Sequence, residues 1–234
     1  MKVDILGMQK RSKRYSASLE GVDANRSYPS KEAIDLVKKT STVKFDASVE
    51  VHVRLGIDPK QTDQSVRFAV KLPHGTGKKK RIAAFVTPAR EAEAKGAGAS
   101  LVGGEELIAK IKQTEKLDFD VAVAEPAMMK NLAAIAKILG TKGKMPSPKT
   151  GSVSPDITRM IQEIAGGKVE SKNDDDGNIH QVVGKVSFET EKLEANLKAF
   201  MEALRAAKPK GAKQDFIRTV TLASSMGPGF RVSI

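Results

Sequence analysis

Apolar and polar residues alternate without interruption between positions 43 and 55. Every odd position, from Val43 to Leu55, is apolar, and every even position is polar or charged. Side chains of a β-strand point alternately to opposite faces of the sheet, so one face of this segment is buried and the other meets solvent or a partner. The pattern therefore predicts a central strand of an antiparallel sheet that has helices on one face.

The segments around this strand predict further parts of the same antiparallel domain. Ser30 is a suitable N-cap for a helix with an apolar face. Residues 66–72 alternate as 43–55 do, and we expect them to form a hairpin with that strand. Asp176-Gly177 is a strong hairpin signal, so strands over 168–172 and 179–188 are expected to pair. The remaining predicted elements are a helix over 190–204 and strands over 217–222 and 230–234.

The middle of the chain has a different pattern, in which short apolar runs alternate with helical segments. The predicted strands are 82–86, 100–102 and 119–124, and the predicted helices are 88–96, 105–112, 126–139 and one that starts at Ser154-Pro155. Such alternation is typical of a small α/β unit with a parallel sheet.

The two patterns together predict an α/β chain with two domains. A discontinuous α+β domain, with an antiparallel sheet and helices, takes residues 1–72 and 157–234. A three-layer, Rossmann-like α/β domain, residues 73–156, is inserted into it. The two connections, near Leu72-Pro73 and Ser154-Pro155, permit hinge motion because a few backbone dihedrals at each crossing suffice.

The charge balance favours a polyanionic partner. Forty Lys and Arg residues face 28 Asp and Glu, a net charge of +12, which indicates nucleic acid first and an anionic membrane second. Residues 8–28 are especially basic and are either an arm that orders on its partner or a solvated surface segment. The absence of cysteine excludes disulfides and thiolate chemistry. Without a signal-peptide core or a membrane-spanning run, we expect a cytoplasmic protein with no membrane partner.

Catalytic or metal chemistry has little support in the sequence. The segment His74-Gly75-Thr76-Gly77-Lys78 lacks the glycine spacing of a Walker loop and reads better as a basic hinge loop. The histidines His52, His74 and His180 lack metal-ligand spacing, and His52 is predicted to be a surface residue. We therefore expect no enzyme activity, no cofactor and no metal. A nucleotide-dependent enzyme that uses the α/β insert is the alternative.

Recognition of folded RNA by shape is the better-supported function. The chain has two Tyr, eight Phe and no Trp, which argues against a base-stacking platform for single strands. Shape recognition needs small polar side chains, glycine and lysine, as in segments 44–48 and 224–229. A tight turn that requires glycine for backbone reasons explains the second segment equally well. A general basic chaperone of nucleic acid, without preference for one RNA, is a further alternative.

Five collinear motifs resemble the bacterial ribosomal protein L-one family, from about residue 8 to the end of the chain. The resemblance implies the interrupted two-domain fold with a hinge, specific binding to the stalk region of large-subunit ribosomal RNA, and no membrane partner. It also implies that the protein assists release of deacylated tRNA from the exit site and represses its own operon by binding a similar mRNA structure. We expect a monomer when free. The motifs are 44–46, 72–78, 102–106, 184–188 and 225–228.

The same resemblance places the RNA site on the terminal domain. It implies phosphate contacts from the two lysines, hydrogen bonds to backbone or 2′-hydroxyls from the three serines, packing on sugar or base by Phe45 and Met226, and close approach at Gly227. The family favours Leu where Lys144 stands, and Thr141, Lys142 and Ser147 also depart from its pattern in the insert loop. The site residues are Lys44, Phe45, Ser48, Lys185, Ser187, Ser225, Met226 and Gly227.

Overall fold

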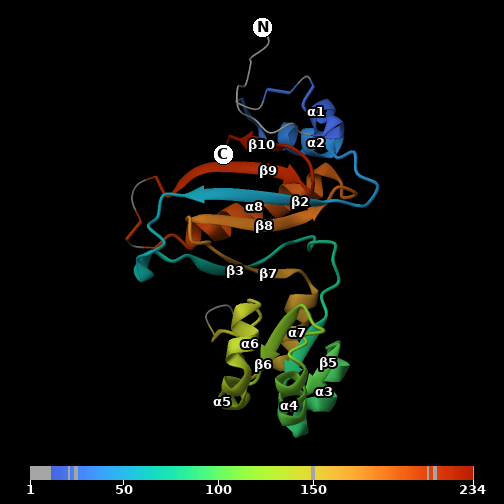
Figure 1. The fold of residues 1–234 in the computed structure, drawn as a ribbon, viewed down its shortest axis with the longest axis vertical. Coiled ribbons are helices and arrows are strands. Elements are labelled where there is room, and N and C mark those ends of the chain that lie inside the picture. Colours follow the sequence, from blue (N-terminus) through green and yellow to red (C-terminus); the bar gives the residue numbers. More distant parts are fainter. Residues whose placement is uncertain are drawn as a thin grey trace.

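The fold is that of a computed structural model, which describes residues 12–20, 22–23, 26–148, 151–209, 211–212 and 215–233. The start of the basic segment, residues 8–11, and the end of the last predicted strand, Ile234, lie outside the described residues. Two groups of elements follow one another along the long axis of the molecule (Figure 1). The larger group contains both ends of the described chain, and the smaller one is built from its middle.

The larger group is organised around a sheet of five strands in the described part of the chain, in the order β1-β10-β9-β2-β8. Strand β2 lies between β9 and β8 and is antiparallel to both, which confirms the predicted central strand. The elements of this group are α1 (Lys13–Ser18), β1 (Ser27–Tyr28), α2 (Ser30–Thr40), β2 (Ser48–Leu55), η1 (Thr62–Gln64), β3 (Arg67–Lys71), β7 (Lys168–Lys172), β8 (Asn178–Lys185), α8 (Thr190–Ala206), β9 (Ile217–Ser224) and β10 (Gly229–Val232).

The prediction that the strand begins at residue 43 is wrong, because β2 begins at Ser48. The ladders with the two neighbouring strands end at Lys185 and at Ser224, so residues 43–47 have no strand beside them. Phe45, which the alternation placed on the buried face, is instead 57% exposed. The pattern therefore gives the faces of β2 correctly but extends the strand too far.

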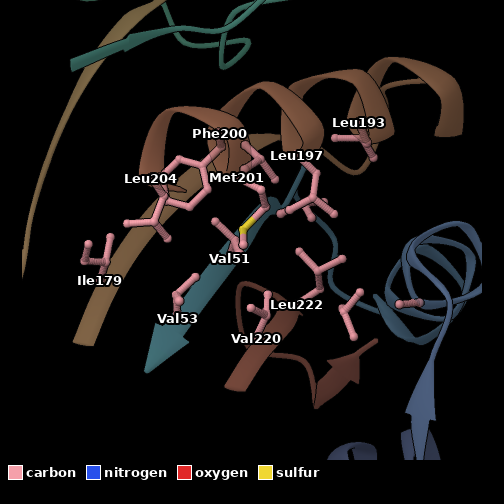
Figure 2. Close-up of a cluster of buried hydrophobic side chains, with 14 of the residues drawn as sticks. Val51, Val53, Ile179, Leu193, Leu197, Phe200, Met201, Leu204, Val220 and Leu222 are labelled. Carbon is pink, nitrogen blue, oxygen red and sulfur yellow. The ribbon is translucent and has the colours of Figure 1, made fainter. Parts of the chain in front are cut away.

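Helices α2 and α8 pack on one face of the sheet and form the main core with it. Side chains of α8 such as Leu197 and Met201 lie against Val51 and Leu222 (Figure 2). Each large side chain buried in this way contributes roughly 1.5–3 kcal/mol. Ser30 is the first residue of α2 rather than its cap, and its hydroxyl donates a hydrogen bond to Glu194 of α8 over 3.0 Å.

Two predicted hairpins are wrong. Residues 66–72 were expected to pair with the central strand, and residues 168–172 with 179–188. Strands β3 and β7 instead pair with each other in a separate two-stranded sheet. The turn at Asp176-Gly177 does form, since a carboxylate oxygen of Asp174 accepts hydrogen bonds from the backbone N–H groups of Asp176 and Asn178. After this turn, however, the chain enters β8 of the five-stranded sheet. The short sheet still contributes to the main core through Phe68, Val70 and Val169.

The smaller group is a three-layer α/β unit. Its parallel sheet has the strand order β5-β4-β6, and buried side chains cover both of its faces. The predicted helix over 126–139 is a succession of short helical turns, although buried residues still recur every three or four positions. The elements are β4 (Ile82–Phe85), η2 (Pro88–Arg90), α3 (Glu91–Gly96), β5 (Leu101–Gly103), α4 (Glu105–Thr114), β6 (Val121–Ala124), η3 (Pro126–Met128), α5 (Met129–Leu132), η4 (Ala133–Ile135), α6 (Ala136–Thr141) and α7 (Ile157–Ala165).

Helix α7 packs in this insert and not in the terminal domain. Its buried residues, including Ile157 and Ile161, share a core with Ile82 of β4 and Val123 of β6. The expected return to the terminal domain near Ser154-Pro155 does not match this packing. We propose that the second connection is at Gly166–Gly167, which makes the insert residues 73–166.

The two connections between the groups touch each other. The Leu72 N–H donates a hydrogen bond to the Gly167 carbonyl over 3.3 Å. A Cβ on Gly167 would lie 2.6 Å from the Cα of Gly75, and the backbone φ at Gly167 is +102°. Glycine is needed here because the two backbones approach too closely for a side chain and because positive φ disfavours other residues.

Candidate nucleic-acid interface

Three segments meet at the end of the five-stranded sheet where β2 begins. They are the approach to β2 with its first residue (43–48), the last residue of β8 with the segment after it (185–188), and the turn between β9 and β10 (225–228). Ser48 is the ladder partner of Lys185 on one side, and its carbonyl accepts a hydrogen bond from the Ser225 N–H over 2.9 Å on the other. The structure thus brings all eight predicted RNA-binding residues onto three adjoining segments.

Asp46 organises the side of this surface next to β8. Its carboxylate accepts hydrogen bonds from both the backbone N–H (3.2 Å) and the hydroxyl (2.9 Å) of Ser187. The Lys185 ammonium donates to the Asp46 carbonyl (3.1 Å) and to the Ser48 hydroxyl (3.0 Å). Two predicted phosphate or ribose ligands, Lys185 and Ser187, are therefore held in position by internal contacts.

Glu50 and the turn 225–228 organise the opposite side. The Ser225 hydroxyl donates a hydrogen bond to the Glu50 carboxylate over 3.1 Å. Met226 has a positive φ of 67°, which is uncommon for a residue other than glycine, and the guanidinium of Arg14 in α1 donates to its carbonyl over 3.0 Å. The side chain of Met226 is directed away from the fold and is 69% exposed.

Gly227 is required by the turn itself. A Cβ at this position would lie 2.2 Å from the hydroxyl oxygen of Ser224, which is buried and has no hydrogen-bond partner among the described residues. The φ of Gly227 is not positive, so the constraint is steric. This geometry supports the backbone explanation for glycine and leaves its role in RNA approach as a prediction.

The remaining residues of the surface are free to meet a partner. Lys44 is exposed, and Phe45 and Met226 are the large hydrophobic side chains that stay exposed in the described residues. Exposed apolar side chains beside a cation suit the sugar and base edges of folded RNA as well as its phosphates. Asp46, Glu50 and Arg14 were missed by the sequence reasoning, because isolated polar residues there read as a solvated face.

The histidines do not form a metal centre in the described part of the chain, where no group of three potential ligands occurs. His52 and His180 nevertheless face each other across β2 and β8, with their Nδ1 atoms 2.8 Å apart. Burial lowers the pKa of His52, and the neighbouring His180 lowers it further against the opposing effect of Glu50. His52 is therefore half of a cross-strand pair rather than an isolated surface residue.

The loop His74–Lys78 is fixed to the terminal domain. Asn196 of α8 is fully buried and accepts a hydrogen bond from the His74 N–H over 3.0 Å. Its amide donates to the carbonyls of Gly75 (2.9 Å) and Val183 (2.8 Å). This loop therefore lies between the two groups of elements, and its role as a hinge stays a prediction.

Residues 37–228 match the model of the Ribosomal protein L1p/L10e family. The chain belongs to this family. It is 50% identical to the proteins named "Large ribosomal subunit protein uL1" of Mycoplasma capricolum subsp. capricolum and of Mycoplasma mycoides subsp. mycoides SC, in each case over 96% of this chain and 99% of the relative. It is also 50% identical to the protein of the same name from Chloroflexus aggregans, over 97% of both chains.

Membership of this ribosomal protein family confirms the resemblance and the α/β fold class. Proteins of the family are structural components of the large ribosomal subunit and not enzymes, so the alternative of a nucleotide-dependent enzyme is not supported. The chain accordingly belongs to the cytoplasmic ribosome. No helix in the described residues is both long and apolar enough to cross a membrane.

Proposed function

We propose that this chain binds the stalk region of large-subunit ribosomal RNA through the surface formed by residues 43–48, 185–187 and 225–227. The observation that carries the proposal is the exposure of Phe45 (57%) and Met226 (69%) at one end of the sheet. Leaving two large apolar side chains in water is unfavourable, and a partner that covers them recovers that free energy. Family membership and the net charge of +12 support RNA as the partner.

Each residue has a chemical role in this proposal. Lys44 and Lys185 contact phosphate, and Ser48, Ser187 and Ser225 accept or donate hydrogen bonds at backbone oxygens or 2′-hydroxyls. Phe45 and Met226 pack on sugar or base faces, and Gly227 keeps the turn low enough for close approach. Because Asp46 and Glu50 already hold the polar side chains in place, little conformational freedom is lost on binding.

The proposal extends to the exit site and to regulation. On the ribosome the chain assists release of deacylated tRNA, and free protein, a monomer, represses its own operon by binding an mRNA structure that imitates the stalk RNA. Both roles are supported by family membership. Repression through the same surface requires the mRNA and the stalk RNA to compete for one molecule of protein.

The test compares stalk RNA with a random duplex of equal length at one salt concentration. Met226→Ala and Phe45→Ala should each weaken stalk-RNA binding by about tenfold, because covering a large apolar side chain contributes about 1.5–3 kcal/mol. Lys198→Ala, at an exposed position of α8 that is not part of the proposed surface, is the control and should change the affinity less than twofold, because salt screens the effect of a distant exposed charge. Circular dichroism should be unchanged in all three variants.

Undiminished affinity in both apolar variants would refute the assignment of this surface. Equal affinity of the parent protein for stalk RNA and random duplex would instead favour the general chaperone of nucleic acid. An operon leader RNA that fails to compete with stalk RNA would remove the regulatory role, and exit-site release that is equally fast without the protein would remove the tRNA role.

A further inference from the structure

A basic cavity separates the two domains. Its volume is about 750 Å³, and it is open to solvent between the β3–β7 sheet on one side and β6 with the loop after α6 on the other. Two carboxylates, of Asp120 and Glu170, also line it. The cationic residues of its lining are Arg67, Lys78, Lys80, Lys144, Lys168 and Lys172.

Only part of this positive charge is neutralised within the protein. Arg67 is paired with Glu170, and Lys168 is paired with Glu163 over 2.9 Å. In the described residues, the other four lysines of the lining form no salt bridge. The second carboxylate, Asp120, lies 3.8 Å from Arg81 and lowers the net charge of the cavity only partly.

Two of these lysines are held in place by contacts within the protein. The ammonium of Lys80 donates to the carbonyl of Lys168 over 3.1 Å, and burial together with Lys78 lowers the pKa of Lys80 against the opposing effect of Asp120. The ammonium of Lys144 lies 5.4 Å from the ring centre of Phe119. The same ammonium donates a hydrogen bond to the Phe119 carbonyl, so Lys144 is oriented within the cavity wall.

We propose that this cavity binds an oligophosphate, a short linear chain of phosphate groups, either free or carried by a nucleotide. Its volume is in the range of small-molecule sites. Its lining contains no aromatic side chain, which argues against recognition of stacked bases. Four ammonium groups that form no salt bridge in the described residues match a ligand of three to five negative charges, and binding relieves their mutual repulsion.

The cations come from both domains, so the ligand bridges them. Lys172 is on β7 of the terminal domain, Lys144 is on a loop of the insert, and Lys78 is on the connection between the two. An anion held by all three groups favours the arrangement in which the walls stay close, because a ligand stabilises the conformation that it binds best. The site is separate from the surface that contains Phe45 and Met226.

The experiment is calorimetric titration of the full chain with sodium tripolyphosphate at low ionic strength. Lys78→Gln combined with Lys172→Gln removes two cations whose side chains make no hydrogen bond or ion pair within the described residues, and should weaken binding about tenfold. The matched control combines Lys110→Gln with Lys198→Gln, which lowers the net charge equally but lies outside the cavity, and should change affinity less than twofold. Lys144→Leu should also weaken binding.

Titrations with other ligands distinguish a free phosphate chain from one that is carried by a nucleotide. ATP that binds as tightly as tripolyphosphate, with the same loss in the Lys78/Lys172 variant, supports recognition of the phosphate chain alone. The proposal is overturned if tripolyphosphate does not bind, if the control variant loses as much affinity as the cavity variant, or if only a hexauridylate strand binds in a manner that depends on the cavity lysines. Lys44→Gln should leave tripolyphosphate binding intact.

Discussion

Replacing Asn196 with leucine would test how the connection between the domains is held. Leucine is similar in size, so the change removes the polar atoms of a fully buried side chain without opening a large cavity. It breaks the hydrogen bonds to the His74 N–H and to the carbonyls of Gly75 and Val183. The first two groups lie near the surface and can find water, whereas the Val183 carbonyl is buried.

The expected destabilisation follows from these three bonds. A hydrogen bond contributes about 1 kcal/mol, and a buried group left without a partner costs about 1–3 kcal/mol. We therefore expect Asn196→Leu to lower the free energy of unfolding by about 2–3 kcal/mol. For a chain of this size that corresponds to a fall in Tm of about 4–12 °C, measured by circular dichroism.

The matched control is Asn131→Leu. Asn131 lies on α5 at the surface and donates one hydrogen bond to Glu105 over 3.0 Å, so its replacement should change stability by less than about 0.5 kcal/mol. Equal melting temperatures for Asn196→Leu and Asn131→Leu would refute the reasoning. That result would mean that the loop 74–77 is positioned by its glycines and not by the buried amide.

Three further predictions concern the surface and the sheet. Lys44→Ala should reduce the slope of log affinity for stalk RNA against log salt by about 0.9, whereas an unchanged slope means that Lys44 contacts no phosphate. Because the pKa of His52 is lowered in the fold, stability should fall as pH drops below about 6.5. His180→Gln should show a smaller fall in Tm between about pH 7.5 and 5.5, because His180 contributes to lowering the pKa of His52. An identical dependence of Tm on pH in the variant would contradict this explanation. Gly227→Ala should lower the free energy of unfolding, measured in urea, by about 1–3 kcal/mol. Adding Ser224→Ala to that variant should restore most of the lost stability, and no recovery would exclude the steric explanation.

The main core was predictable because its signals are local. The odd positions from Val49 to Leu55 are all buried, and the helix over 190–204 has the length and apolar face that its spacing predicts. Both signals depend on a periodicity within one segment. Burial then fixes the register of β2, because a shift by one residue would expose the whole apolar row.

Strand partners were not predictable in the same way. Residues 66–72 have the alternation of a strand next to the core, but nothing in that segment distinguishes β2 from β7 as a neighbour. The hairpin signal at Asp176-Gly177 specifies a turn. Whether the strands on either side of that turn pair or enter different sheets depends on packing across the whole domain. The predicted boundary before helix α7 has the same weakness, since its apolar face fits either core, and the core that it shares with Ile82 and Val123 supports the boundary proposed above.

The RNA surface shows a third limit, which concerns what each polar residue does. The resemblance gave the eight residues together, and the structure divides them into two groups. The side chains of Ser48, Lys185, Ser187 and Ser225 make hydrogen bonds within the protein, whereas those of Lys44, Phe45 and Met226 make none in the described residues and Gly227 has no side chain. A sequence motif cannot separate these groups, because it does not show which polar side chains find partners within the fold.

This division explains why acids occur in a surface that is proposed to bind a polyanion. Asp46 and Glu50 each use carboxylate oxygens on a serine beside the cation or the exposed methionine. The negative charge of the two acids repels phosphate, but salt screens this repulsion strongly at long range. Their hydrogen bonds act at contact distance and fix the serine hydroxyls before RNA binds. With the donors oriented in advance, the hydroxyl oxygens remain free to accept from 2′-hydroxyl groups. The two acids therefore favour discrimination of a particular folded RNA over attraction to any RNA, as expected of a chain whose overall charge of +12 already supplies non-specific affinity.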